Sequence, residues 1–164
     1  MNVIQKSEAI KNGFQKGFQD GSSKMAKRKC YGYTINSNGE LEINLGEAKV
    51  VSWIFERFLA GDSLGKIASG LERQGILSPT GKPRWNWEAI NKLLSNEKYT
   101  GRVLLQKTIS TGAVQIENNG LMERYLYTNS RGAIISDEMF LAAQQAKLGR
   151  SKNLQNQVAM RRTF

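Results

Sequence analysis

Four polar side chains in the middle of the chain are spaced so that they fall on one face of a helix. They are Glu88, Asn91, Lys92 and Ser95, and residues three, four and seven positions apart share such a face. Together they present a carboxylate, an amide, an ammonium and a hydroxyl to one surface. In the DNA major groove, asparagine suits adenine, lysine suits guanine and glutamate suits the amino group of cytosine. The spacing therefore predicts a helix that reads base pairs.

The residues around this segment could position such a helix. Asn86 is a good N-cap, because its side chain can accept a hydrogen bond from an orphan backbone N–H. The opposite face of the helix is apolar and carries Trp87, Ile90 and Leu94, with Ala89 and Leu93 beside them.

A second amphipathic helix precedes it. Its apolar positions are Leu64, Ile67, Ala68 and Leu71. Gly75 ends this helix, and the glycine and prolines at 79–83 keep the next residues non-helical. The pair is typical of a helix-turn-helix, although two amphipathic helices joined by a turn can also pack with no partner at all.

The remaining chain predicts an α+β domain. We expect a helix over residues 3–20, a hairpin around Asn38-Gly39 and a core helix from Asn44 to Gly61. Asn44 and Glu47 resemble a capping box. Residues 102–110 predict a strand, two shorter strands follow within 112–117 and 123–128, and Ser136 caps a closing helix that ends near Gly149. The predicted architecture is thus a helix-turn-helix-containing domain with a small antiparallel β-sheet and a C-terminal helix.

The net charge of +10 gathers at the two ends of the chain. Residues 1–30 hold seven basic and two acidic side chains, residues 144–164 hold five basic and none acidic, and residues 31–143 hold twelve of each. Positive segments that flank a base-reading helix are suited to a phosphate backbone.

Two groups of basic residues are the candidates for these backbone contacts. We expect Lys82, Arg84 and Arg102 to hold phosphates. We expect the segment that carries Lys24, Lys27, Arg28 and Lys29 to follow a minor groove. The alternative for that segment, which also contains glycine and serine, is a solvated linker.

The composition argues against several other classes. No stretch approaches the roughly 18 apolar residues of a membrane span, and we expect no signal peptide. With no histidine and one cysteine, Cys30, a Cys/His zinc site within the chain is excluded. We expect a reducing, cytoplasmic location, no catalytic residue and no cofactor.

The order and spacing of many short pieces resemble one known family, the large serine recombinases. These proteins are site-specific integrases and transposases of bacterial phages and mobile elements. The resemblance covers residues 21–148. The matching pieces are Tyr31-Gly32-Tyr33, Glu47-Ala48, Ile54-Phe55, Gly61, Ser63-Leu64, Ile67-Ala68, Leu71, Gly75, Thr80-Gly81, Trp85, Ile90, Leu94, Asn96, Tyr99, Gly101-Arg102 and 133–140.

The resemblance implies a DNA-binding module that lies between an N-terminal catalytic domain and a C-terminal zinc-ribbon domain. Residues 1–20 then correspond to the end of a linker helix, 21–33 to a basic arm, 34–148 to the DNA-binding domain, and 149–164 to a flexible tail. The implied partners are double-stranded DNA, as an attachment site, and the recombinase's own catalytic and zinc-ribbon domains. Zinc and the catalytic serine would belong to those domains, so the chain is expected to be a fragment that is inactive alone and associates with the bacterial nucleoid when bound to DNA.

The chain departs from the family pattern at Trp87, where proline is common, and at Asn96-Glu97, where an Asn-Pro step is common. We expect Trp87 to pack on the protein, the alternative being a contact with DNA. Two other classes also remain open. One is a helix-turn-helix transcriptional regulator without recombinase activity, and the other is a protein-interaction or RNA-binding module.

Overall fold

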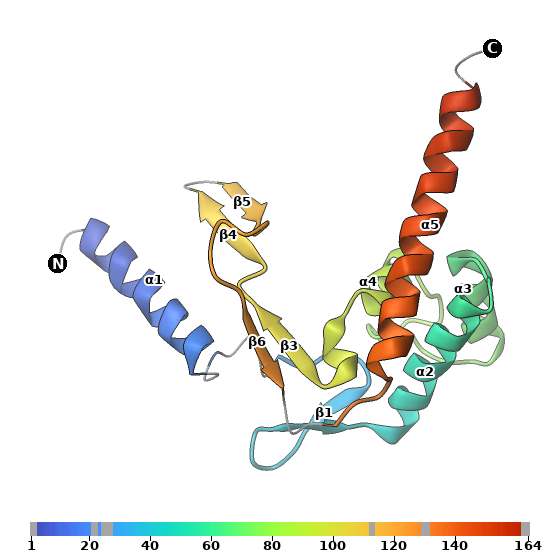
Figure 1. Ribbon diagram of the computed structural model, residues 1–164. Helices are drawn as coiled ribbons and strands as arrows, with labels where there is room; N and C mark the ends of the chain where they lie inside the picture. The colour runs from blue at the N-terminus through green and yellow to red at the C-terminus, as the bar shows by residue number, and fades with distance from the viewer. Residues whose placement is uncertain (1–2, 21–22, 24–27, 112–113, 129–131, 162–164) are drawn as a thin grey trace.

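The structure is a computed structural model that describes residues 3–20, 23, 28–111, 114–128 and 132–161. These residues form a mixed α+β fold, which confirms the expected class (Figure 1). The helices are α1 (Val3–Gln19), α2 (Leu45–Leu59), α3 (Leu64–Arg73), α4 (Trp87–Leu94) and α5 (Asp137–Arg161), with a 3₁₀ helix, η1 (Glu97–Thr100). The strands are β1 (Tyr33–Ile35), β2 (Leu41–Ile43), β3 (Arg102–Leu105), β4 (Thr108–Thr111), β5 (Val114–Glu117) and β6 (Tyr125–Thr128).

The described strands pair as three two-stranded antiparallel sheets rather than one continuous sheet. β1 pairs with β2 across the predicted hairpin, with Tyr33 opposite Ile43. β3 pairs with β6, with Arg102 opposite Thr128, and β4 pairs with β5, with Thr108 opposite Glu117.

The main hydrophobic core lies among α2, α3, α4 and the first half of α5. The apolar stripe expected on α2 is buried at Val51, Ile54, Phe55 and Phe58, whereas Val50 is half-buried and Leu59, in the last turn, is exposed. The buried residues of α2 form one cluster with side chains from other helices, strands and connections. These side chains are Tyr33, Ile67, Leu71, Trp85, Ile90, Leu94, Tyr99, Ile135 and Ala143. Burial of each large side chain contributes about 1.5–3 kcal/mol, so this cluster is the frame on which α4 is mounted.

A second, smaller cluster joins α1 to the strands. Phe18 of α1 packs with Val103 and Leu105 of β3, and Tyr125 of β6 lies against them. In Figure 1, α1 and the β4–β5 pair lie to the left of the helical part that contains α2 to α5.

The start of α2 differs in one detail from the capping box that the sequence predicts. Asn44 caps the helix, with its side chain accepting from the N–H groups of Gly46 and Glu47. The Glu47 carboxylate, however, accepts from the N–H of Gly32 at 2.8 Å. The N–H of Asn44, which would be its partner in a capping box, donates instead to the carbonyl of Gly32. The box is incomplete because a residue distant in sequence competes for both groups.

The strand predicted over residues 102–110 is broken in two at Gln106, whose φ is +60°. Asn118, which is buried, donates to the carbonyls of Gln106 and Met122 at 2.9 and 2.8 Å. These bonds stabilise a bend that local propensity gives no reason to expect. The closing helix is also longer than predicted, because α5 passes through Gly149 and reaches Arg161; one glycine costs a helix only about 1 kcal/mol.

Across the described ranges, the helices lack the combination of length and apolar character that crossing a membrane requires.

Candidate nucleic-acid interface

The start of α4 follows the sequence prediction. Asn86 has extended backbone angles, φ −82° and ψ 134°, and its side chain accepts from the N–H of Glu88 at 2.9 Å. Glu88 adds a negative charge in the first turn, where the helix dipole favours one. The cap fixes the residue at which α4 begins, and hence which side chains face outwards.

The inner face of α4 is anchored in the core. Ile90, Leu93 and Leu94 are buried, and α4 packs against α2, α3 and α5. The prediction that Trp87 shares this buried face is wrong, because its side chain is 56% exposed.

Trp85 occupies the core in its place. Its indole Nε1 donates to the carbonyl of Ile76 at 2.8 Å, and its ring meets Tyr31 edge to face with centroids 5.6 Å apart. One indole therefore fills the space below the start of α4, and Trp87 is left on the surface beside Glu88.

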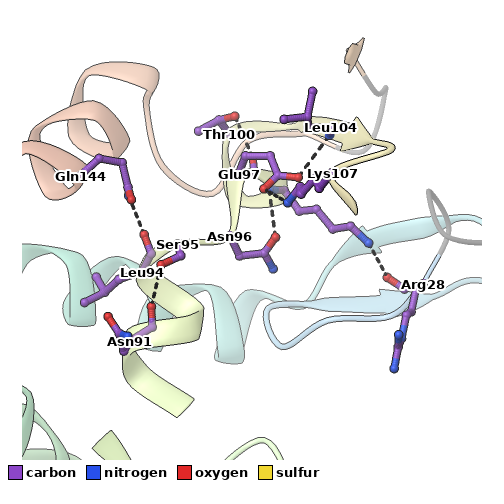
Figure 2. A network of polar contacts seen from close by, with 11 residues as sticks. Arg28, Asn91, Leu94, Ser95, Asn96, Glu97, Thr100, Leu104, Lys107 and Gln144 are labelled. Atoms are coloured by element: carbon purple, nitrogen blue, oxygen red, sulfur yellow. Dashed lines mark hydrogen bonds and ion pairs between the residues drawn. The ribbon is translucent and has the colours of Figure 1, made fainter. Parts of the chain in front are cut away.

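The outer face of α4 carries the four predicted base-reading residues. Glu88 and Lys92 are exposed, Asn91 is half-buried and Ser95 is exposed. At the C-terminal end, the Ser95 hydroxyl donates to the Asn91 carbonyl at 2.9 Å (Figure 2). Lys147 of α5 donates to the same carbonyl at 3.3 Å and also contacts the Ser95 hydroxyl. Glu88 and Lys92 thus face outwards, whereas Asn91 and Ser95 lie along the border between α4 and α5.

The residues after α4 tie its end to the rest of the molecule. Asn96 caps η1 by accepting from the N–H of Lys98. Glu97 accepts from the N–H of Leu104 at 3.1 Å and pairs with Lys107 at 2.6 Å (Figure 2). The ammonium of Lys98 donates to the carbonyl of Arg28 at 3.2 Å. The predicted basic arm therefore joins the described structure beside the C-terminal end of α4.

The predicted backbone-contacting residues divide into three groups. Lys82 and Arg84, in the connection between α3 and α4, and Arg28 and Lys29, in the arm, are exposed. Arg102 instead pairs with Asp137, with 2.6 Å between Nη2 and Oδ2. Lys24 and Lys27 lie outside the described residues.

The connection that carries Lys82 is held by hydrogen bonds between its two sides. The N–H of Ser78 donates to the Lys82 carbonyl at 2.9 Å, and the Ser78 hydroxyl accepts from the N–H of Lys82 at 3.1 Å. Ser78 is buried, whereas the side chain of Lys82 is exposed. A positive charge is thus presented from an ordered backbone next to the start of α4.

Two residues that support this surface were not predicted from the sequence. Gln144 of α5 donates to the carbonyl of Leu94 at 2.7 Å, and Lys147 contacts Asn91 and Ser95. The sequence shows only that these two residues lie three positions apart and therefore share a face of α5. It does not show which other element that face contacts.

A second basic cluster lies between α2 and α3, around a cavity of about 330 Å³. Asp62 pairs there with Arg57 and Lys66, at 2.5 and 2.7 Å. The hydrogen bond from Lys66, followed by that from Arg57, holds the pKa of Asp62 below its ordinary value. The positive charges of this cluster are partly neutralised within the protein. Lys82, Arg84 and Lys92 differ from them, because these three form no ion pair with any residue in the described ranges.

The fold and this surface together define a mixed α+β module with a short, well-anchored helix whose polar face is bordered by basic residues. Residues 46–150 match the family described as Recombinase. The chain therefore belongs to the Recombinase family, which confirms the resemblance seen in the sequence.

Two solved structures resemble the chain. "Crystal Structure of a LSR-DNA Complex" has 22% sequence identity and a TM-score of 0.52, and the match covers 76% of this chain and 32% of that one. "Sequence Requirements of the Listeria innocua prophage attP site" has 22% identity and a TM-score of 0.49, with coverage of 72% and 41%. The first similarity supports the fold, and in both cases this chain spans less than half of the length of the solved chain.

Proposed function

We propose that this chain binds double-stranded DNA in a sequence-specific manner and recognises an attachment half-site, as the DNA-binding part of a serine site-specific recombinase. Membership in the Recombinase family supports this function over that of a transcriptional regulator. One of the similar structures is a complex with DNA, by its own description. We assign no catalytic residue and no cofactor to residues 1–164. In this proposal, cleavage and rejoining of DNA through phosphoserine linkages belongs to another domain of the same recombinase.

The observation that carries the proposal is the exposed polar face of α4 on a rigidly held helix. Three apolar side chains bury its inner face, Asn86 caps its start, and Glu88 and Lys92 point outwards at the i, i+4 spacing. In helix-turn-helix proteins, the second helix lies in the major groove with its N-terminal residues nearest the bases. We therefore place Glu88, in the first turn, closest to the base edges, together with the exposed Lys92, whereas Asn91 and Ser95 lie at the border with α5.

The flanking basic residues supply the sequence-independent part of binding. Lys82 and Arg84 precede α4 directly, and Arg28 and Lys29 lie beside η1. We propose phosphate contacts for these four residues, and minor-groove contacts for the arm that continues through Lys27 and Lys24. Arg102 was expected to hold a phosphate too, and to do so it would have to share its charge with Asp137.

Selection of bound duplexes from a random pool tests the function. We expect enrichment of one motif, and competition by duplex DNA but not by single-stranded DNA or RNA of equal length. Absence of an enriched motif, or preferential binding of RNA, would refute sequence-specific duplex recognition.

Charge-removing variants test the division of roles. Lys82→Ala should weaken binding to all duplexes equally and reduce the slope of log K against log salt by about one unit. Lys49→Ala is the matched control, since Lys49 is an exposed lysine on α2, remote in sequence from α4 and its flanks. If both variants behave like the original protein, Lys82 does not contact a phosphate.

A further inference from the structure

The C-terminal end of α4 depends on α5 for its hydrogen bonds. The last four carbonyls of any α-helix lack partners within that helix, and in α4 they belong to residues 91–94. The N–H of Ser95 donates to the carbonyl of Lys92, and the N–H of Asn96 donates to the carbonyl of Leu93. The carbonyl of Leu94 accepts from Gln144 at 2.7 Å, and that of Asn91 accepts from Lys147 at 3.3 Å and from the Ser95 hydroxyl.

Both α5 side chains are suited to holding α4 in one position. The Gln144 amide also donates to the Phe140 carbonyl of its own helix at 3.4 Å, which restricts the side chain to the orientation that reaches Leu94. The Lys147 ammonium lies at the negative end of the α4 dipole, where a positive charge is stabilising. Lys147 is half-buried, and burial lowers its pKa.

The contacts of Lys147 leave it poorly placed to bind DNA. An ammonium has three N–H donors, and two acceptors of α4, the Asn91 carbonyl and the Ser95 hydroxyl, already take part of that capacity. The amide of Gln144 has two N–H donors, and its nitrogen already donates to the carbonyls of Leu94 and Phe140. Both residues therefore act on α4 itself.

The support matters because α4 is short. It has eight residues, and isolated helices below about 12–15 residues are marginal in water. Its position relative to a ligand must therefore be set by tertiary contacts. The buried residues fix its inner face, and the two α5 side chains fix the end that carries Asn91 and is followed by Ser95.

We infer that Gln144 and Lys147 are positioning residues that hold the C-terminal end of α4 and thereby set how well it discriminates between DNA sequences. This inference rests on the proposed function. It assigns sequence discrimination to two residues that touch no base and no phosphate, and it makes the pose of the reading helix a property of α5.

Five single variants test the inference. Gln144→Ala and Lys147→Met remove the two supports, while Gln145→Ala and Lys152→Met remove exposed side chains of the same types from the same helix. The ratio of affinities for the selected duplex and for random duplex should fall about 3- to 10-fold for each support variant, as expected for loss of one hydrogen bond. The control variants should keep the ratio, and Lys147→Arg should restore it because it retains the charge and the donors.

Salt dependence separates positioning from direct contact. For Lys147→Met, we expect the affinity for random duplex and the salt slope to stay as in the original protein. An equal loss on all duplexes with a slope reduced by about one unit would identify a phosphate contact instead and overturn the inference.

Hydrogen exchange tests the support without DNA, so it stands even if the proposed function fails. The amide protons of Ser95 and Asn96 should exchange faster in both support variants than in the controls, while those of α3 keep their rates. Unchanged exchange at Ser95 and Asn96 would overturn the inference, whereas a failure to select any duplex would count against the proposed function alone.

Discussion

Gly32 is the position where the structure gives the sharpest prediction of stability. Its φ is +95°, in the region that favours glycine, and a Cβ added at this residue would lie 2.8 Å from Cδ1 of Ile134. The same Cβ would lie 3.2 Å from Val51 and 3.3 Å from Tyr99, both of which are buried. The Ile134 methyl is the end of a flexible side chain, whereas Val51 and Tyr99 are buried in a close-packed core. Gly32→Ala therefore combines backbone strain with overpacking.

The size of the effect follows from these two causes. A left-handed backbone costs a non-glycine residue about 1–2 kcal/mol, and overpacking a core costs about 1–3 kcal/mol. We expect Gly32→Ala to lower the free energy of unfolding by about 2–5 kcal/mol. This loss is a large part of the total unfolding free energy of a typical protein, which is about 5–15 kcal/mol.

Gly39→Ala is the matched control for backbone strain. Gly39 has φ +75°, but no atom lies within 4 Å of the position that its Cβ would take. Its variant should lose only about 1–2 kcal/mol. The small stabilisation from reduced freedom of the unfolded chain is common to both variants and cancels in their difference.

Urea denaturation followed by tryptophan fluorescence measures the free energy of unfolding of both variants, because Trp85 is buried in the core that Gly32 contacts. Equal losses at Gly32 and Gly39 would show that the contacts with Ile134, Val51 and Tyr99 relax freely, and would refute the packing argument.

Two further predictions concern stability. Asp62→Asn should destabilise the protein at neutral pH. The lowered pKa of Asp62 stabilises the folded state at pH values above the pKa of an aspartate in the unfolded chain, which is about 3.9. The difference between the two proteins should shrink as the pH falls through the folded pKa, and a difference that persists in acid would argue against the Lys66 and Arg57 contacts as its cause. Trp85→Phe should lose about 1–3 kcal/mol in urea denaturation because the Ile76 carbonyl loses its partner. Trp87→Phe, on the exposed indole, should stay within about 0.5 kcal/mol, and similar losses for the two would contradict the assignment of Trp85 to the core.

Features that depend on neighbouring residues were predictable from the sequence. The Asn38-Gly39 hairpin, the caps at Asn44, Asn86 and Ser136, and the buried stripe of α2 all appear where they were expected. Each depends on side-chain chemistry within a few residues of its own position, or on periodicity within one helix.

Features that depend on distant residues were not predictable. Glu47 binds Gly32 rather than completing a capping box, Asn118 bends the chain at Gln106, and Trp85 takes the core position expected for Trp87. The support of α4 by Gln144 likewise joins residues 50 positions apart. In each case a tertiary hydrogen bond or packing contact decided between conformations that the local sequence allows.

The comparison of Lys92→Ala with Lys49→Ala tests the central claim, that the outer face of α4 reads base pairs. Both variants remove one exposed helical lysine, so they differ in position and not in charge. The measurement is the affinity of each variant for the selected duplex and for versions of it with each base pair replaced in turn. Lys92→Ala should lose about 1–3 kcal/mol of binding free energy on the selected duplex and become indifferent to one base pair. Lys49→Ala should keep the original pattern of affinities. If Lys92→Ala instead weakens all of these duplexes equally, or none of them, the outer face of α4 does not read base pairs.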